Sequence, residues 1–231
     1  GLGFREGAHT TSFSIGIDSP EVIREKVKLA ESYPILKLKV GVKNDRENLK
    51  ALRDIAPDKT VRVDANEGWK TREHAIEMLE FLAADKKIGF CEQPMPTTAS
   101  REDMAWLKER SPLPLMGDES YVTDKDLADC AEFFHSVNVK LVKAGGISGA
   151  MAALRAARKA GMKTMLGCMI ESSVLISAAA QLAELTDYLD LDGNILISND
   201  PFTGPTADKG IVSYKNAQEP FGLRVKPRLS R

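Results

Sequence analysis

Short apolar runs alternate with longer stretches of helical spacing along almost the whole chain. The short runs are rich in β-branched and apolar residues, whereas the longer stretches repeat apolar positions every three or four residues. Polar residues that suit helix N-caps precede several of these stretches, as Ser19 and Thr71 do. The pattern predicts strands within residues 12–17, 35–41, 61–66, 89–94, 114–120, 137–146, 162–172 and 188–193, with helices between them.

This alternation is typical of a (β/α) barrel, although a doubly wound open sheet has the same local pattern. The phosphate-binding patterns of open sheets, GxGxxG after the first strand and GxxxxGK[ST], do not occur in the sequence. We therefore predict an α/β fold, a TIM-type catalytic barrel over residues 1–193. The irregular residues 194–231 are expected to form a tail that covers the barrel. Because the chain begins with GLGFREGAHTT rather than with Met, we also expect that an N-terminal portion is missing.

The composition indicates which kind of molecule the protein binds. The 231 residues have a formal net charge of −1 with acids and bases interspersed, which argues against nucleic acid or a membrane surface and favours a small-molecule substrate. The three widely spaced cysteines suggest neither disulfides nor zinc, so the cytoplasm is the expected location. No apolar run approaches the roughly 18 to 20 residues of a membrane helix. A homo-oligomer is left open.

Two lysines lie one residue apart in the strand-like run ILKLKVG, residues 35–41. Side chains alternate between the two faces of a strand, so the apolar Leu36 and Leu38 suit the helix layer while Lys37 and Lys39 point into the barrel. An exposed amphipathic strand would explain the same pattern, but a parallel strand covered by helices has no solvent face. Lys39 is therefore expected at the mouth of the barrel.

The same parity places three carboxylates at the ends of successive strands: Asp64 in VRVDAN, Glu92 in GFCEQP and Asp118 in PLMGDES. Buried carboxylates so close together are costly unless a hard cation holds them, and oxygen ligands without His or Cys fit Mg²⁺ better than zinc. The alternative is that some of these acids cap helices or pair with lysines.

On the sixth predicted strand, parity selects Lys140 as the inward lysine and leaves Lys143 in a loop. Lys39 and Lys140 are then expected on opposite sides of the substrate. Two facing lysines and a metal site suit proton abstraction next to a carboxylate, with an enediolate intermediate and 1,1-proton transfer. Lys37 is expected to tune Lys39 and to contact the substrate.

The motifs KLK at Lys37 to Lys39, DAN at Asp64, EQP at Glu92, GDES at Asp118 and NVK at Lys140 together resemble the enolase superfamily, in its muconate-lactonizing-enzyme-like subgroup. The resemblance covers nearly the whole chain. It implies a modified (β/α)7β barrel, Mg²⁺ bound by the three acids, and acid–base roles for Lys39 and Lys140. We expect three further residues to contact and orient these groups without binding the substrate: Asn66, Asn138 and Glu119.

The last strands indicate which member the chain resembles. Asp190 and Asp192 in DLDG could grip an ammonium group, or could serve as a capping or supporting pair. This DxD motif resembles the one that holds the α-ammonium of the substrate in the dipeptide epimerases of the superfamily. The L-Ala-D/L-Glu epimerases of cell-wall peptide recycling are the best known of these enzymes. Met169, Ile170 and Glu171 are expected to line the pocket of the N-terminal residue, although a plain core strand explains the apolar pair equally well.

Several alternatives stay open. An o-succinylbenzoate synthase or N-succinylamino acid racemase would share the lysines and the metal site, but its substrate has no ammonium group. A Schiff-base aldolase would need one lysine and no metal. Superfamily members also carry an N-terminal capping domain, on which residues 194–231 would pack. Its expected absence from this chain favours a further alternative, a degenerate barrel without catalytic activity.

Overall fold

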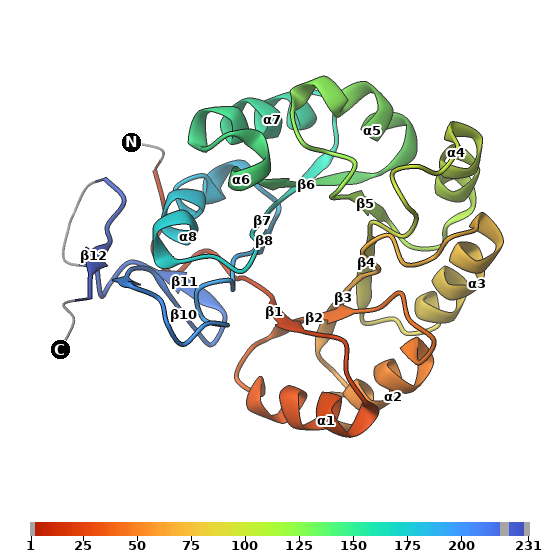
Figure 1. Cartoon of the computed structure of the whole chain (residues 1–231), viewed down its shortest axis with the longest axis horizontal. Helices are drawn as coiled ribbons and strands as arrows, with labels where there is room; N and C mark the ends of the chain where they lie inside the picture. Colours follow the sequence, from red (N-terminus) through yellow and green to blue (C-terminus); the bar gives the residue numbers. More distant parts are fainter. Residues whose placement is uncertain (1–2, 218–221, 229–231) are drawn as a thin grey trace. The chain divides into compact units, whose positions relative to one another are not determined.

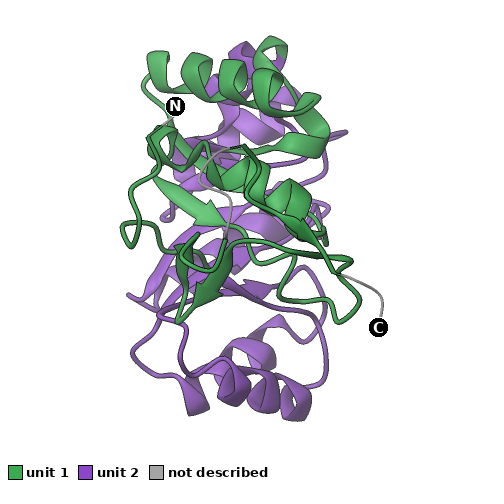
Figure 2. Ribbon diagram, turned by 90° about the vertical axis from the view of Figure 1, so that its left-hand side faces the viewer, with its two compact units in different colours: residues 1–12, 122–125, 138–231 green, residues 13–121, 126–137 purple. Residues whose placement is uncertain are grey.

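The computed structural model describes residues 3–217 and 222–228 (Figure 1). The chain divides into two compact units, coloured separately in Figure 2. Unit 1 comprises Gly1–Ser12, Val122–Lys125 and Asn138–Arg231, and unit 2 comprises Phe13–Tyr121 and Asp126–Val137.

Unit 2 alternates parallel strands with helices, which lie on the outer side of the strands in Figure 1. Its elements are β1 (Phe13–Ile15), α1 (Pro20–Leu29), β2 (Ile35–Lys39), α2 (Asp45–Ile55), β3 (Thr60–Asp64), α3 (Arg72–Ala83), β4 (Ile88–Glu92), α4 (Arg101–Arg110), β5 (Leu115–Gly117), α5 (Leu127–Phe133) and the start of β6 (Ser136–Lys140).

Two predicted caps, Ser19 and Thr71, begin helices of unit 2. The hydroxyls of Ser19 and Thr71 accept hydrogen bonds from backbone N–H groups in the first turns of α1 and α3, and Ser100 does the same for α4. Asn44, which precedes α2, makes no such bond with its side chain. Apolar residues of β2, Leu36 and Leu38, are fully buried, as expected for a strand covered by helices.

Unit 1 contains the end of β6, a set of helices and strands that follows it, and two small two-stranded sheets. The elements are α6 (Leu141–Ala144), α7 (Ile147–Lys159), β7 (Lys163–Gly167), α8 (Ser173–Ala180), β8 (Tyr188–Asp190), β9 (Phe202–Thr203), β10 (Thr206–Asp208), β11 (Ile211–Ser213) and β12 (Lys226–Pro227).

Strands β1 to β8 form one sheet in chain order, and the seven connections between them contain helices. This order confirms the predicted α/β barrel class. The prediction was wrong about residues 137–146, which we expected to form one extended run. The strand ends at Lys140, and Lys143 lies on the short helix α6 rather than in a loop. Gly145, with φ of 77°, ends that helix in the left-handed conformation.

The described part of segment 194–231 contacts other elements of unit 1. Strand β11 bridges to Thr10, and the phenol of Tyr214 donates a hydrogen bond of 2.5 Å to the carbonyl of Ser177 on α8. The carboxylate of Asp200 accepts from the backbone N–H and the hydroxyl of Ser173. The division at residue 193 stays a prediction. Every helix in residues 3–217 and 222–228 is too short or too polar to cross a lipid bilayer.

Candidate functional site

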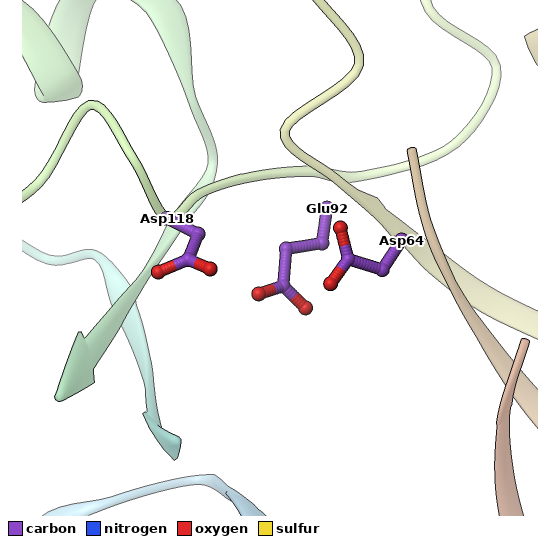
Figure 3. A group of neighbouring side chains, drawn as sticks. All are labelled: Asp64, Glu92 and Asp118. Carbon is purple, nitrogen blue, oxygen red and sulfur yellow. The ribbon is translucent and has the colours of Figure 1, made fainter. Parts of the chain in front are cut away.

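Three carboxylates of unit 2 converge at the ends of successive strands (Figure 3). Asp64 ends β3 and Glu92 ends β4, and the two residues are paired in the sheet register, while Asp118 follows β5 directly. One oxygen of each carboxylate lies within 4.8 Å of the others, and all three residues are at most 1% exposed. The structure thus brings together the three acids that strand parity selected.

This cluster has the donor set of a hard divalent cation. It offers three carboxylates and includes no imidazole or thiolate. Buried carboxylates this close repel one another, and a cation is the group that offsets such repulsion best. The residues present therefore fit a metal ion. Their role as ligands stays a prediction.

The two lysines of β2 lie against these acids. The ammonium of Lys37 is 2.9 Å from Asp64 Oδ2 and 2.8 Å from Glu92 Oε2, and that of Lys39 is 2.7 Å from Asp64 Oδ2. Burial alone would raise the pKa of Asp64, but the ammonium groups of Lys37 and Lys39 outweigh it and hold that pKa below its usual range. The Lys37 side chain is 3% exposed and that of Lys39 28%, so Lys39 is the lysine that solvent reaches.

Asn66 and Glu119 extend the network. Asn66, with φ of 42°, donates its backbone N–H to Asp64 Oδ1, accepts from the Lys39 ammonium at 2.8 Å and donates its side-chain amide to Glu119. Burial, followed by the charge of Asp118, raises the pKa of Glu119. Both residues lie where they could support Lys39 and Asp64.

Gln93 is a residue that sequence reasoning missed. Fully buried and in the left-handed region with φ of 35°, it accepts hydrogen bonds from the backbone N–H of Asp118 and of Ser120. Its amide donates to the carbonyl of Met95 and the hydroxyl of Ser120. Gln93 thus fixes the loop that carries Asp118 beside the strand that ends in Glu92. The EQP motif contained it, but nothing in the apolar pattern signals its role.

In unit 1, Lys140 ends β6 and its ammonium lies 3.9 Å from the sulfur of Met169. Met169 and Ile170 are exposed in the loop after β7, so the prediction of a strand through residue 172 was too long. Burial raises the pKa of the nearby Glu171, while the backbone N–H of Met169 and the charge of Lys140 act in the opposite direction. Buried Asn138 lies so close to β7 that a Cβ at Gly167 would come within 2.4 Å of it.

Asp190 and Asp192 are both 3% exposed, Asp190 as the last residue of β8 and Asp192 two residues beyond it. The hydroxyl of Ser12 and the thiol of Cys168 contact them. Neither Ser12 nor Cys168 was among the predicted site residues. The opposition of Lys39 and Lys140 joins residues of different units and stays a prediction.

Residues 21–210 match the family model described as enolase C-terminal domain-like. The chain belongs to this family. The predicted membership of the enolase superfamily is thereby confirmed.

The chain is similar to several dipeptide epimerases and to related racemases. It is 65% identical to the L-Ala-D/L-amino acid epimerase of Pedosphaera parvula, over 99% of this chain and 66% of that protein. It superposes with a TM-score of 0.86 and 29% identity on the dipeptide epimerase of Cytophaga hutchinsonii complexed with Mg and D-Ala-L-Val, covering 99% of this chain and 64% of that one. The TM-score is 0.88, with 28% identity, for the N-succinyl Arg/Lys racemase of Bacillus cereus, covering 98% of this chain and 62% of that one.

The chain spans 66% of the length of the first of these relatives and 64% and 62% of the other two. In fold, the likeness to an N-succinyl Arg/Lys racemase is as close as the likeness to a dipeptide epimerase, whereas the 65% sequence identity is to an L-Ala-D/L-amino acid epimerase. The fold therefore does not distinguish between dipeptides and N-succinyl amino acids as substrates. The distinction has to come from individual side chains of the site.

Proposed function

We propose that this enolase-family chain belongs to a Mg²⁺-dependent dipeptide epimerase that inverts the α-carbon of the C-terminal residue, with L-Ala-D/L-Glu or a related dipeptide as substrate. The buried pair Asp190 and Asp192 carries this proposal, because two carboxylates at one strand end suit the α-ammonium of a dipeptide. The names of the relatives, dipeptide and L-Ala-D/L-amino acid epimerases, support it.

Asp64, Glu92 and Asp118 would hold the metal ion. When bound, Mg²⁺ supplies positive charge that stabilises the negative charge developing on the substrate carboxylate as the α-proton leaves. The bound magnesium of the Cytophaga hutchinsonii protein supports the choice of this ion.

Lys39 and Lys140 would exchange the α-proton, one removing it from one face and the other returning a proton to the opposite face. Each lysine must be neutral to accept a proton. Lys37 lies between Asp64 and Glu92, where its ammonium can orient the substrate carboxylate. Met169, Ile170 and Glu171 would line the pocket of the N-terminal residue.

The expected place of this reaction is the cytoplasm, and cell-wall peptides are the expected source of the dipeptide. Both follow from the cysteine usage and the resemblance described above.

A racemase of N-succinylamino acids, or an o-succinylbenzoate synthase, is the second candidate, favoured by the equally close likeness in fold to the Bacillus cereus N-succinyl Arg/Lys racemase. Such substrates offer no ammonium to Asp190 and Asp192. A barrel without catalytic activity is the third candidate.

A dipeptide library incubated with the full-length protein in D₂O tests the proposal. We expect Mg²⁺-dependent incorporation of one deuterium at the α-carbon of the C-terminal residue, seen by mass spectrometry, together with formation of the other epimer. EDTA should abolish both. Exchange of N-succinyl amino acids alone would favour the second candidate, and the absence of exchange in both substrate classes would favour the third.

Changing Asp190 and Asp192 together to Asn should weaken turnover of dipeptides far more than turnover of an N-succinyl substrate. Equal losses on the two substrates would remove the reason for preferring dipeptides.

A further inference from the structure

The segment that precedes β1 is bound closely to β8 within unit 1. Thr11 bridges to Leu189 in parallel register, and the backbone N–H of Ser12 donates to the carbonyl of Leu189 at 3.3 Å. The hydroxyl of Thr11 accepts from the backbone N–H of Leu191 at 2.6 Å. The backbone on both sides of Asp190 is therefore fixed to residues 11 and 12.

Ser12 also holds the side chain of Asp190. Its hydroxyl donates to Asp190 Oδ1 at 2.6 Å, and Ser12 is fully buried. This distance is typical of a hydroxyl bound to an ionised carboxylate, and such bonds are about twice as strong as those between neutral groups. The carbonyl of Leu189, at 3.5 Å, is a much poorer acceptor for the single hydroxyl proton.

The thiol of Cys168 lies close to both residues of the pair. The thiol of Cys168 lies 3.8 Å from Asp192 Oδ1 and 3.2 Å from the carbonyl of Asp190. Burial, followed by the charges of Asp192 and Asp190, raises the pKa of this thiol well above its usual value, so it keeps its proton at neutral pH. A hydroxyl donor orients a carboxylate without adding a positive charge of its own.

We propose that Ser12 is a positioning residue whose hydroxyl fixes the carboxylate of Asp190 to receive the α-ammonium of the substrate. This inference rests on the proposed function, because it gives Asp190 the role assigned there. It adds a residue that was not among the predicted site residues and that acts on the substrate only through Asp190.

Steady-state kinetics of Ser12→Ala in the full-length protein test this inference. We compare L-Ala-L-Glu with N-propionyl-L-glutamate, which has the same skeleton but lacks the ammonium group. Loss of a hydrogen bond to a charged group should raise the KM for L-Ala-L-Glu by about tenfold while kcat changes little. The rate of α-proton exchange of N-propionyl-L-glutamate should be unchanged.

Two further variants separate positioning from general damage. Ser12→Thr retains the hydroxyl and should restore a KM close to that of the wild type. Ser177→Ala removes another buried hydroxyl of unit 1, one that contacts Tyr214 instead of Asp190, and should leave KM unaltered. In a protein already carrying Asp190→Asn, Ser12→Ala should raise KM no further.

The outcomes distinguish the two claims. If the wild type epimerises L-Ala-L-Glu but Ser12→Ala has an unchanged KM, or loses rate equally on both substrates, the positioning role is wrong and the proposed function stands. If the wild type exchanges no dipeptide proton, the proposed function fails, and this inference fails with it.

Discussion

At the scale of single residues, neighbours decide which buried groups hold protons. The ammonium groups of Lys37 and Lys39 keep Asp64 ionised although burial opposes this. Cys168 has the opposite environment, since burial and two carboxylates all disfavour its thiolate. The residues involved in each case are distant in sequence, so the composition and the apolar pattern could not reveal these shifts. The alternation of side chains along β2 did place both lysines on the same face as Asp64.

The raised pKa of Cys168 predicts slow alkylation. The thiolate is the reactive form, so at pH 8 iodoacetamide should modify Cys168 of the folded protein at least about tenfold more slowly than in urea. The rate should rise with pH, with a midpoint above that of the unfolded chain. Asp192→Asn removes one of the charges that raise this pKa, so it should speed alkylation.

Peptide mass spectrometry over a pH series measures these rates. Cys91 serves as an internal control, because burial and then Asp64, Glu92 and Asp45 raise its pKa, and Asp192 is not among these causes. A Cys168 that reacts as fast in the folded protein as in urea would contradict the environment described.

At the scale of strands and loops, register explains why the acids meet. Lys39 pairs with Asp64 and Asp64 with Glu92, so the ends of β2, β3 and β4 lie side by side. Strand periodicity could predict this convergence. It could not predict the loop contacts of Gln93, because these depend on a left-handed backbone and on N–H groups of another loop. Strand periodicity also gave a wrong prediction for residues 141–144, which form one helical turn. A short apolar run fits a strand or a helix equally well, and contacts with the rest of the fold determine which one forms.

Gln93→Leu should weaken metal binding. Without the side-chain amide, the backbone N–H groups of Asp118 and Ser120 lose their acceptor, and Asp118 is held less firmly beside Glu92. Loss of such a supporting contact typically lowers metal affinity about 10- to 100-fold. Titration calorimetry with Mg²⁺ measures the change.

Asn48→Leu is the matched control, since Asn48 is another fully buried amide of unit 2 and makes no contact with the three acids. It should alter stability while leaving Mg²⁺ affinity within about twofold of the wild type. Equal loss of affinity in both variants would mean that general loosening of unit 2, rather than Gln93, is responsible.

At the scale of the whole molecule, the account depends on residues from both units. The three acids proposed as metal ligands and Lys39 belong to unit 2, whereas Lys140, Asp190 and Asp192 belong to unit 1. Local pattern and strand parity were sufficient to select all of these residues. The alternation of strands and helices could not distinguish dipeptides from N-succinyl amino acids as substrates, because proteins acting on either class share this fold. In this chain the distinction depends on a single pair of acids, Asp190 and Asp192.

Lys39 and Lys140 are proposed to act on opposite faces of one α-carbon. Deuterium incorporation from D₂O into L-Ala-L-Glu and, separately, into L-Ala-D-Glu tests this proposal in the variants Lys39→Ala and Lys140→Ala, with Lys143→Ala as the control. We predict that both variants lose epimerisation, that each exchanges the α-proton of only one epimer, and that the two variants exchange opposite ones, while Lys143→Ala behaves as the wild type. Undiminished epimerisation by Lys39→Ala, or exchange of the same epimer by both variants, would contradict the two-lysine mechanism.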